Sequence, residues 1–240
     1  MRLKFIVCKV LQKEAYLCAA RSSNIVDIVL MEQGLHNTPD VLRTEVQKEL
    51  EKLTDVAGNK YDAVLLGYGL CGNGIAGLRC AIPLVAPRAH DCITLLLGSI
   101  KRHLEYQENH RGVYWYSDGW IATDTMPGRQ RYEKLLAEYT EKYGADNAAY
   151  LMETEQSWMK EYGWAVYIDW GIKGTEEQIE YTRQCADYLG WKYDRIKGDA
   201  GLLQRLVDGQ WDEKEFLIVP AGKRIAEDLG EPGLIRSQEE

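Results

Sequence analysis

The chain has 240 residues, of which 45% are hydrophobic and 28% charged. This composition excludes a chain dominated by disorder, and the longest apolar runs are far shorter than the ~20 residues of a membrane helix. The net charge of -8, from 29 Lys and Arg against 37 Asp and Glu, argues against nucleic acid as a partner. The N-terminus lacks the apolar stretch and cleavage site of a secretory signal, so we expect a cytoplasmic protein whose cysteines are thiols or ligands.

The first half of the chain alternates between strand and helix patterns. Helices are expected from Thr38 to about Leu53 and from Cys92 to about His110, capped by Thr38 and by Asp91. Strands are expected at residues 4–10, 25–31, 61–66, 82–87 and 112–117. The alternation predicts an α/β fold with a mainly parallel, Rossmann-like sheet and helices on both faces.

The second half begins with a helical, Tyr-rich stretch over residues 127–163 that we expect to break at Gly144. Alternation then returns, and the helix after Thr175 carries a capping box of Thr175 with Gln178 and a stop at Gly190. The remaining expectations are strands at 164–170, 193–196 and 216–219, a helix at 199–207, and a frayed end over the last ten residues.

These patterns suggest two parts, an N-terminal α/β lobe over 1–126 and a helical segment with a smaller α/β lobe over 127–240. A helix, a strand and a glycine loop occur in the same order in both parts. The matching segments are 41–53 with 61–66, and 202–207 with 216–219. Two similar lobes with a ligand between them are therefore an open alternative.

Three cysteines lie at or near the carboxyl ends of expected strands. Cys8 ends the first strand, Cys71 follows residues 61–66, and Cys92 follows residues 82–87, two positions after His90. Carboxyl ends of parallel strands meet at one edge of a sheet, where ligands bind. Cys8, Cys71, His90 and Cys92 are therefore candidate ligands of zinc or of an iron–sulfur cluster.

The cysteines also have other interpretations. Cys92 at the first turn of a helix is a candidate nucleophile, because the helix dipole stabilises a thiolate, with His90 or His36 as the base. Cys8 and Cys71 can equally be small buried hydrophobes. We assign Cys18 and Cys185 to the core and leave Cys80 open.

A glycine-rich loop from Gly67 to Gly74 follows the strand at 61–66. Gly67, Gly69 and Gly72 match the letters of a dinucleotide fingerprint, but no acidic residue follows at the required distance. The loop can cradle an anion on its backbone N–H groups, or it can let the backbone approach Cys71 and a ligand closely. Arg88, just ahead of His90, is a candidate to hold a carboxylate or a phosphate.

Three stretches together resemble a bacterial and archaeal family, the domain of unknown function 1638. They are Leu66-Gly67-Tyr68-Gly69-Leu70-Cys71-Gly72, Pro87-Arg88-Ala89-His90-Asp91-Cys92 and Leu95-Leu96-Leu97-Gly98-Ser99. The resemblance covers most of the chain and supports the fold and the Cys/His positions. It implies no established activity, although such proteins are loosely associated with corrinoid-dependent methyl transfer.

The set of candidate ligands is also similar to that of zinc-dependent thiol methyltransferases, which carry an H-x-C pair and a distant Cys. Those enzymes are larger (β/α) barrels, and this chain lacks eight β/α units. The leading expectation is a zinc-binding protein for thiol or methyl-group transfer, acting on a small-molecule substrate or with a corrinoid protein. The alternatives are a non-catalytic carrier of a corrinoid, a tetrapyrrole or an iron–sulfur cluster, and a metal-free cysteine hydrolase or transferase. The sequence does not determine the oligomeric state.

Overall fold

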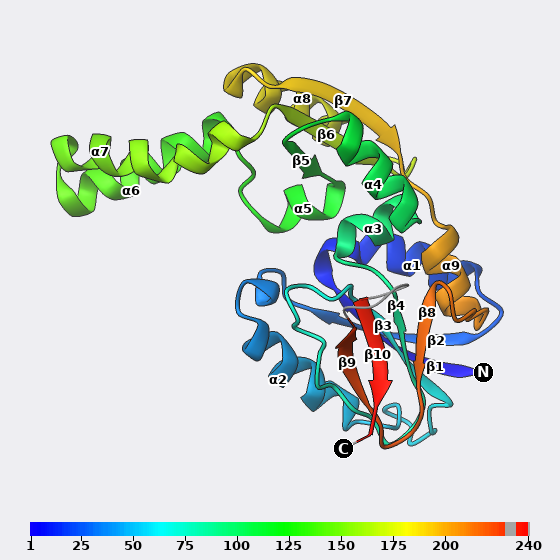
Figure 1. Ribbon diagram of the computed structural model, residues 1–240. Coiled ribbons are helices and arrows are strands. Elements are labelled where there is room, and N and C mark those ends of the chain that lie inside the picture. The colour runs from blue at the N-terminus through cyan, green and yellow to red at the C-terminus, as the bar shows by residue number, and fades with distance from the viewer. Residues whose placement is uncertain (229–233, 240) are drawn as a thin grey trace. The chain divides into compact units, whose positions relative to one another are not determined.

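A computed structural model describes residues 1–228 and 234–239. The chain forms two compact units (Figure 1). Unit 1 contains residues 1–103 and 199–240, and unit 2 contains residues 104–198. The boundaries thus lie at 103/104 and 198/199, whereas the sequence suggested a boundary at 126/127. No helix in the described ranges is long and apolar enough to cross a bilayer.

Unit 1 is built on a five-stranded sheet with the order β2-β1-β3-β4-β8. The first four strands are parallel, and β8 is antiparallel to β4. The strands are β1 (Arg2–Cys8), β2 (Ile25–Met31), β3 (Ala63–Gly67), β4 (Leu84–Pro87) and β8 (Phe216–Val219). Every residue of β3 and β4 is buried, as expected for strands covered on both faces. The mainly parallel α/β fold predicted from the sequence is confirmed.

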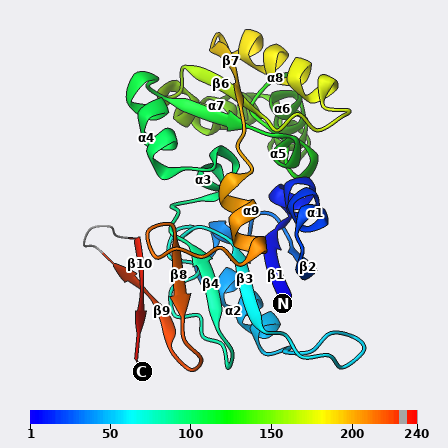
Figure 2. The same cartoon turned by 90° about the vertical axis from the view of Figure 1, so that its right-hand side faces the viewer.

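Helices cover both faces of this sheet (Figure 2). The chain runs from β1 through α1 (Gln12–Arg21) to β2 on one side, and from β2 through α2 (Pro39–Leu50) to β3 on the other. Right-handed crossovers in opposite directions place α1 and α2 on opposite faces. Helix α9 (Gly201–Asp208) packs on α1, and α3 (Cys92–Leu97) packs on the 3-10 turn η1 (Lys9–Leu11).

Unit 2 has its own parallel sheet, with the order β5-β6-β7. Its core is made of Tyr116, Met126, Ala165, Tyr167, Cys185 and Ala186. The strands are β5 (Val113–Tyr116), β6 (Trp164–Asp169) and β7 (Lys192–Lys197), and α8 (Glu176–Leu189) packs on β6 and β7. The remaining elements are α4 (Ile100–Asn109), α5 (Asp118–Thr123), α6 (Arg129–Tyr143), α7 (Ala145–Glu155) and the 3-10 turn η3 (Ser157–Glu161). Helices α6 and α7 pair as a hairpin that breaks at Gly144, as predicted (Figure 1).

Several local predictions are wrong. The helix expected from Cys92 to His110 is two helices, because Gly98 takes a left-handed φ of 72° and ends α3. The capping box at Thr175 does not form, since the Thr175 hydroxyl donates to the Ile172 carbonyl instead. Thr38 precedes α2 without a side-chain cap. Asp91 caps α3 as predicted.

The end of the chain also differs from the prediction of fraying. Residues 234–238 form β10 (Leu234–Gln238), which pairs antiparallel with β9 (Arg224–Asp228). Of the ten last residues, 231–233 and 240 lie outside the described ranges. The two segments expected to repeat across two lobes are not in separate lobes, because β3 and β8 belong to the same sheet of unit 1.

Candidate thiol site

The strand order of unit 1 defines the place where a ligand is expected. The connection from β1 leads to β2, and β3 lies on the other side of β1, so the order reverses between β1 and β3. In open α/β sheets, ligands bind beyond the carboxyl ends of the strands at such a switch point. Cys8 is the last residue of β1, and Tyr68 and Cys71 follow the end of β3. The sequence placed the cysteines at this edge, and the topology now identifies the edge as a switch point.

Tyr68 lies among the three candidate cysteines. Its side chain is 3% exposed. Burial raises its pKa above the usual range, and negative charge on Cys8, Cys71 and Cys92 would raise it further. Cys8 at the end of β1, Cys71 in the loop after β3 and Cys92 at the start of α3 therefore lie near enough to one buried phenol to affect its pKa. We call Tyr68, Cys8, Cys71 and Cys92 the thiol site.

The Tyr68 hydroxyl faces the Cys8 thiol and affects its pKa. It nevertheless makes no well-formed hydrogen bond with any group in residues 1–228 and 234–239. A buried hydroxyl without such a bond costs about 1–3 kcal/mol. The orphaned oxygen points to a polar or metal-bound group as its natural partner. Tyr68 was not among the site residues predicted from the sequence, although its place between Gly67 and Gly69 at a strand end was a usable signal.

The two thiols that end or follow the central strands are protonated at neutral pH. Burial raises the pKa of Cys8, and it raises the pKa of Cys71 to about 12, with smaller contributions from Asp91 and Cys8. Cys8 is 7% exposed, whereas Cys71 and Cys92 are half-buried. Neither Cys8 nor Cys71 is in a disulfide. A metal ion or another cation is therefore needed to make these thiols thiolates near pH 7.

The loop that carries Cys71 is fixed to the loop that carries Cys92. Leu70 N donates to Ala89 O at 2.7 Å, and Cys71 N donates to His90 O at 2.9 Å. Gly69 permits this contact, since a Cβ there would lie 2.5 Å from Asp91 N and 2.7 Å from Ala89 O. Gly69 therefore allows the backbone beside Cys71 to approach the neighbouring loop closely, and the predicted approach to a ligand stays a prediction.

Cys71 itself has an uncommon backbone conformation. Its φ is 47°, and its neighbours Gly72 and Asn73 have φ values of 62° and 68°. A non-glycine residue in the left-handed region is uncommon and costs of order 1–3 kcal/mol. Such strain concentrates at functional sites. The backbone conformation does not favour cysteine, so we infer that this position holds a cysteine because of its thiol.

Asp91 and His103 organise the start of α3. Asp91 Oδ1 accepts from Ile93 N at 3.0 Å and from Thr94 N at 3.2 Å. His103 Nδ1 lies 3.1 Å from the Thr94 hydroxyl and 3.9 Å from Asp91 Oδ1. Burial lowers the pKa of His103, against the opposing effect of Asp91. His103 was not among the predicted site residues, because its approach to Thr94 depends on the turn at Gly98.

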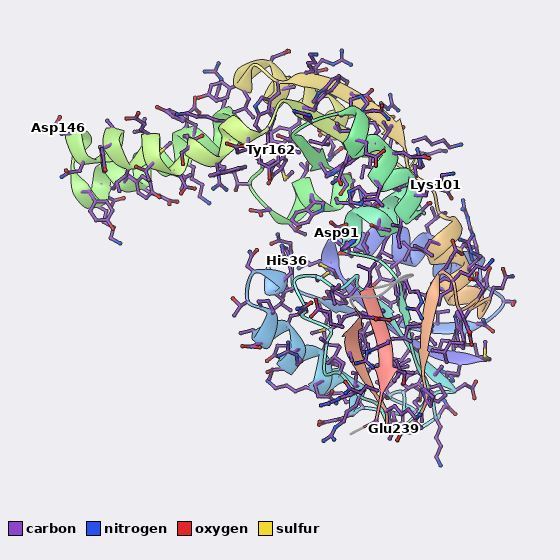
Figure 3. The ribbon with its side chains drawn as sticks, in the orientation of Figure 1. His36, Asp91, Lys101, Asp146, Tyr162 and Glu239 are labelled. Carbon is purple, nitrogen blue, oxygen red and sulfur yellow. The ribbon has the colours of Figure 1, made fainter. Side chains whose placement is uncertain are left out.

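The two predicted histidines lie on this side of unit 1. His90 is exposed and close enough to His103 to lower the pKa of that imidazole. His36 is half-buried in the 3-10 turn η2 (Leu35–Asn37), which follows β2. Figure 3 shows His36 and Asp91 at the same end of the unit 1 sheet. Both histidines remain candidates for a base, and His90 also for a ligand.

The other predicted binding residues have structural roles. A Cβ at Gly67 would collide with the Val7 side chain, so this glycine is required for packing. Gly72 faces Pro39 across an ordinary contact of 3.8 Å and serves the left-handed turn. The Arg88 guanidinium donates to the carbonyls of Glu213 and Ile235 and thereby holds the C-terminal segment. These contacts account for Arg88 without an anion.

The donor atoms of the thiol site suit zinc, which prefers thiolate and imidazole ligands. In the described ranges, however, no three His, Cys, Asp or Glu side chains form a group that could hold a metal ion. The donor chemistry therefore fits zinc, and the spacing requires the cysteine side chains to turn toward one another. Cys18, Cys80 and Cys185 are buried, as predicted for core residues in the case of Cys18 and Cys185.

The fold and the site together define an α/β protein with cysteines near the switch point of a mainly parallel sheet. A family model described as "Protein of unknown function (DUF1638)" matches residues 30–207, and the chain belongs to this family. The match includes Cys71, His90 and Cys92 and begins after Cys8. No curated protein and no solved structure matches the chain.

Proposed function

We propose that the thiol site binds zinc through Cys8, Cys71 and Cys92 and serves thiol or methyl-group transfer. The observation that carries the proposal is that Cys8, Cys71 and Cys92, from three separate elements of unit 1, all affect the pKa of the buried Tyr68 hydroxyl. Three protein ligands leave one position of a tetrahedral zinc open for a substrate, as in catalytic zinc sites. His90 is available as a fourth ligand or as a base for the incoming thiol.

Zinc would supply what the protein alone does not. Burial keeps Cys8 and Cys71 as neutral thiols, and coordination favours the thiolate form of a ligand. A substrate thiol at the open position would be activated in the same way, and Tyr68 is placed to donate a hydrogen bond to a thiolate or to a bound substrate. The substrate class is a small thiol or a methyl donor, including the methyl group of a corrinoid protein.

A second candidate is supported by the difference in exposure among the cysteines. Cys92 is half-buried at the first residue of α3, so it is the more accessible partner of the buried Cys8. A metal-free hydrolase or transferase would use Cys92 as the nucleophile and His90 or His36 as the base. We rank this candidate second because it uses Cys92 alone, whereas Cys8, Cys71 and Cys92 all affect the pKa of the buried Tyr68.

Metal content distinguishes these functions. The full chain is purified without oxygen, and its metals are measured by elemental analysis together with a visible spectrum. We expect about one zinc per chain, lost in Cys92→Ala because one of three protein ligands is removed. Cys80→Ala is the matched control, since Cys80 is a buried thiol of the same unit that lies outside the thiol site.

The proposal would be overturned if the wild type holds no zinc after anaerobic reconstitution, or if Cys92→Ala keeps its zinc. Iron with sulfide, or cobalt with a corrinoid spectrum, would replace it with the cofactor-carrier alternative. If the wild type contains no metal and reacts with iodoacetamide, and Cys92→Ala loses that reaction, the result would favour Cys92 as a catalytic nucleophile.

A further inference from the structure

A basic groove lies beside α2 in unit 1 and shares no lining residue with the thiol site. It consists of two adjoining hollows of about 490 and 520 Å³, which have Gln47, Glu51 and Arg79 in common. The lining of the second hollow includes Arg43, Lys48, Glu51, Arg79 and Arg224. Arg43 and Lys48 are ion-paired with Asp40 at 2.7 Å and with Glu45 at 2.6 Å, so the argument rests on Arg79 and Arg224.

Two of these arginines are directly opposite each other. Arg79 and Arg224 form an isolated antiparallel bridge, so their side chains start from neighbouring positions. Like charges at directly opposite positions destabilise such a pair. In residues 1–228 and 234–239, the Arg224 guanidinium has no hydrogen-bond or ion-pair partner. An anion bound at this point would give the Arg224 guanidinium a partner.

The backbone around the arginines is held in place before any ligand arrives. Gln47 binds Arg79 at both ends of its amide, accepting from Arg79 N at 3.2 Å and donating to Arg79 O at 3.1 Å. Ile225 N donates to Leu78 O at 2.9 Å, which fixes β9 beside this segment. Preorganisation of this kind lowers the entropic cost of binding.

We propose that this groove binds a small molecule through a phosphoryl group, with Arg79 and Arg224 as its principal ligands. The planar guanidinium presents parallel N–H donors that match phosphate oxygens in pairs. Two such groups at adjacent positions suit a group with several anionic oxygens, such as a diphosphate. The hollow that contains Leu50 and Leu53 accommodates a less polar part of the ligand.

The test is isothermal titration of the full chain with inorganic pyrophosphate at low ionic strength. We expect saturable binding of one pyrophosphate per chain, weakened at least tenfold in the Arg79→Gln/Arg224→Gln double variant. Arg21→Gln is the matched control, because Arg21 is an exposed arginine of the same unit at the end of α1. The single variant Arg224→Gln, expected to be several-fold weaker, covers the case in which the double variant does not fold.

Other probes decide the chemistry of the ligand. Citrate, which carries its charge on carboxylates, is expected to bind more weakly than pyrophosphate. Absence of pyrophosphate binding by the folded wild type would overturn the proposal, as would equal binding by the wild type and Arg224→Gln. Tighter binding of citrate, or of a single-stranded RNA oligonucleotide, would overturn the assignment to a phosphoryl-bearing small molecule.

Discussion

Replacing Gly69 with alanine is expected to lower the free energy of unfolding by about 3 kcal/mol, the upper end for overpacking in a well-packed region. The added Cβ would lie 2.5 to 2.7 Å from Asp91 N, Ala89 O and His90 C. All three are backbone atoms, so the collision is relieved only by moving one loop from the other. That movement breaks the hydrogen bonds of Leu70 N and Cys71 N and separates Cys71 from Cys92.

Thermal unfolding followed by circular dichroism measures this loss, which corresponds to a fall in Tm of about 10 °C for a chain of this size. Gly163→Ala is the control of equal volume, since a Cβ there meets only Arg111 O at 3.8 Å. We expect Gly69→Ala to lose zinc as well, at temperatures where it is still folded. An unchanged Tm with full metal content would show that the two loops are not in contact.

Zinc uptake is expected to release two to three protons per ion at pH 7. Thiols bind zinc as thiolates, and Cys8 and Cys71 are protonated at this pH because burial raises their pKa values. The apparent affinity for zinc should therefore rise steeply with pH between about 6 and 8, by about a hundredfold per unit if two protons leave. Titration of the metal-free protein in a weakly buffered indicator solution gives the number of protons directly.

The raised pKa of Cys71 also makes the stability of the metal-free protein depend on pH. The folded pKa of Cys71, about 12, exceeds the unfolded value, so the folded state binds a proton that the unfolded state loses first. Stability from this group is complete below about pH 8.5 and is lost as the pH rises toward 12. Cys71→Ala should remove about one released proton per zinc, and Cys80→Ala none. Zinc uptake without proton release would contradict thiol coordination.

Much of the fold could be predicted because it depends on local patterns. The alternation of buried strands and amphipathic helices indicated a parallel sheet, and the carboxyl-end rule then brought Cys8, Cys71 and Cys92 to one edge. Asp91 was identified as a cap because its bonds to Ile93 and Thr94 are local.

The features that the sequence did not reveal depend on contacts between distant segments. The Arg88 guanidinium donates to the carbonyls of Glu213 and Ile235, more than a hundred residues away, so its position before His90 gave no indication of these partners. The surroundings of the Tyr68 side chain come from three separate segments of the chain. Only the folded sheet shows that Cys8, Cys71 and Cys92 are near enough to affect its pKa. The capping box at Thr175 failed because a competing local acceptor, the Ile172 carbonyl, takes its hydroxyl.

The unit boundaries were missed for a similar reason. The strand Val113–Tyr116 follows the first half of the chain without a change in composition, yet it pairs with Trp164–Asp169. Strand pairing across about fifty residues leaves no local signal. The antiparallel pairing of Phe216–Val219 with Leu84–Pro87 likewise returned the C-terminal segment to the first sheet instead of building a second lobe.

X-ray absorption spectroscopy of the zinc-loaded protein shows whether Cys8, Cys71 and Cys92 bind one metal ion. Sulfur and nitrogen ligands are resolved by their distances from zinc, about 2.3 Å and about 2.0 Å. We expect three sulfur neighbours in the wild type and two in any residual zinc bound by Cys92→Ala. A first shell of nitrogen and oxygen alone, or an unchanged sulfur count in the variant, would contradict this expectation.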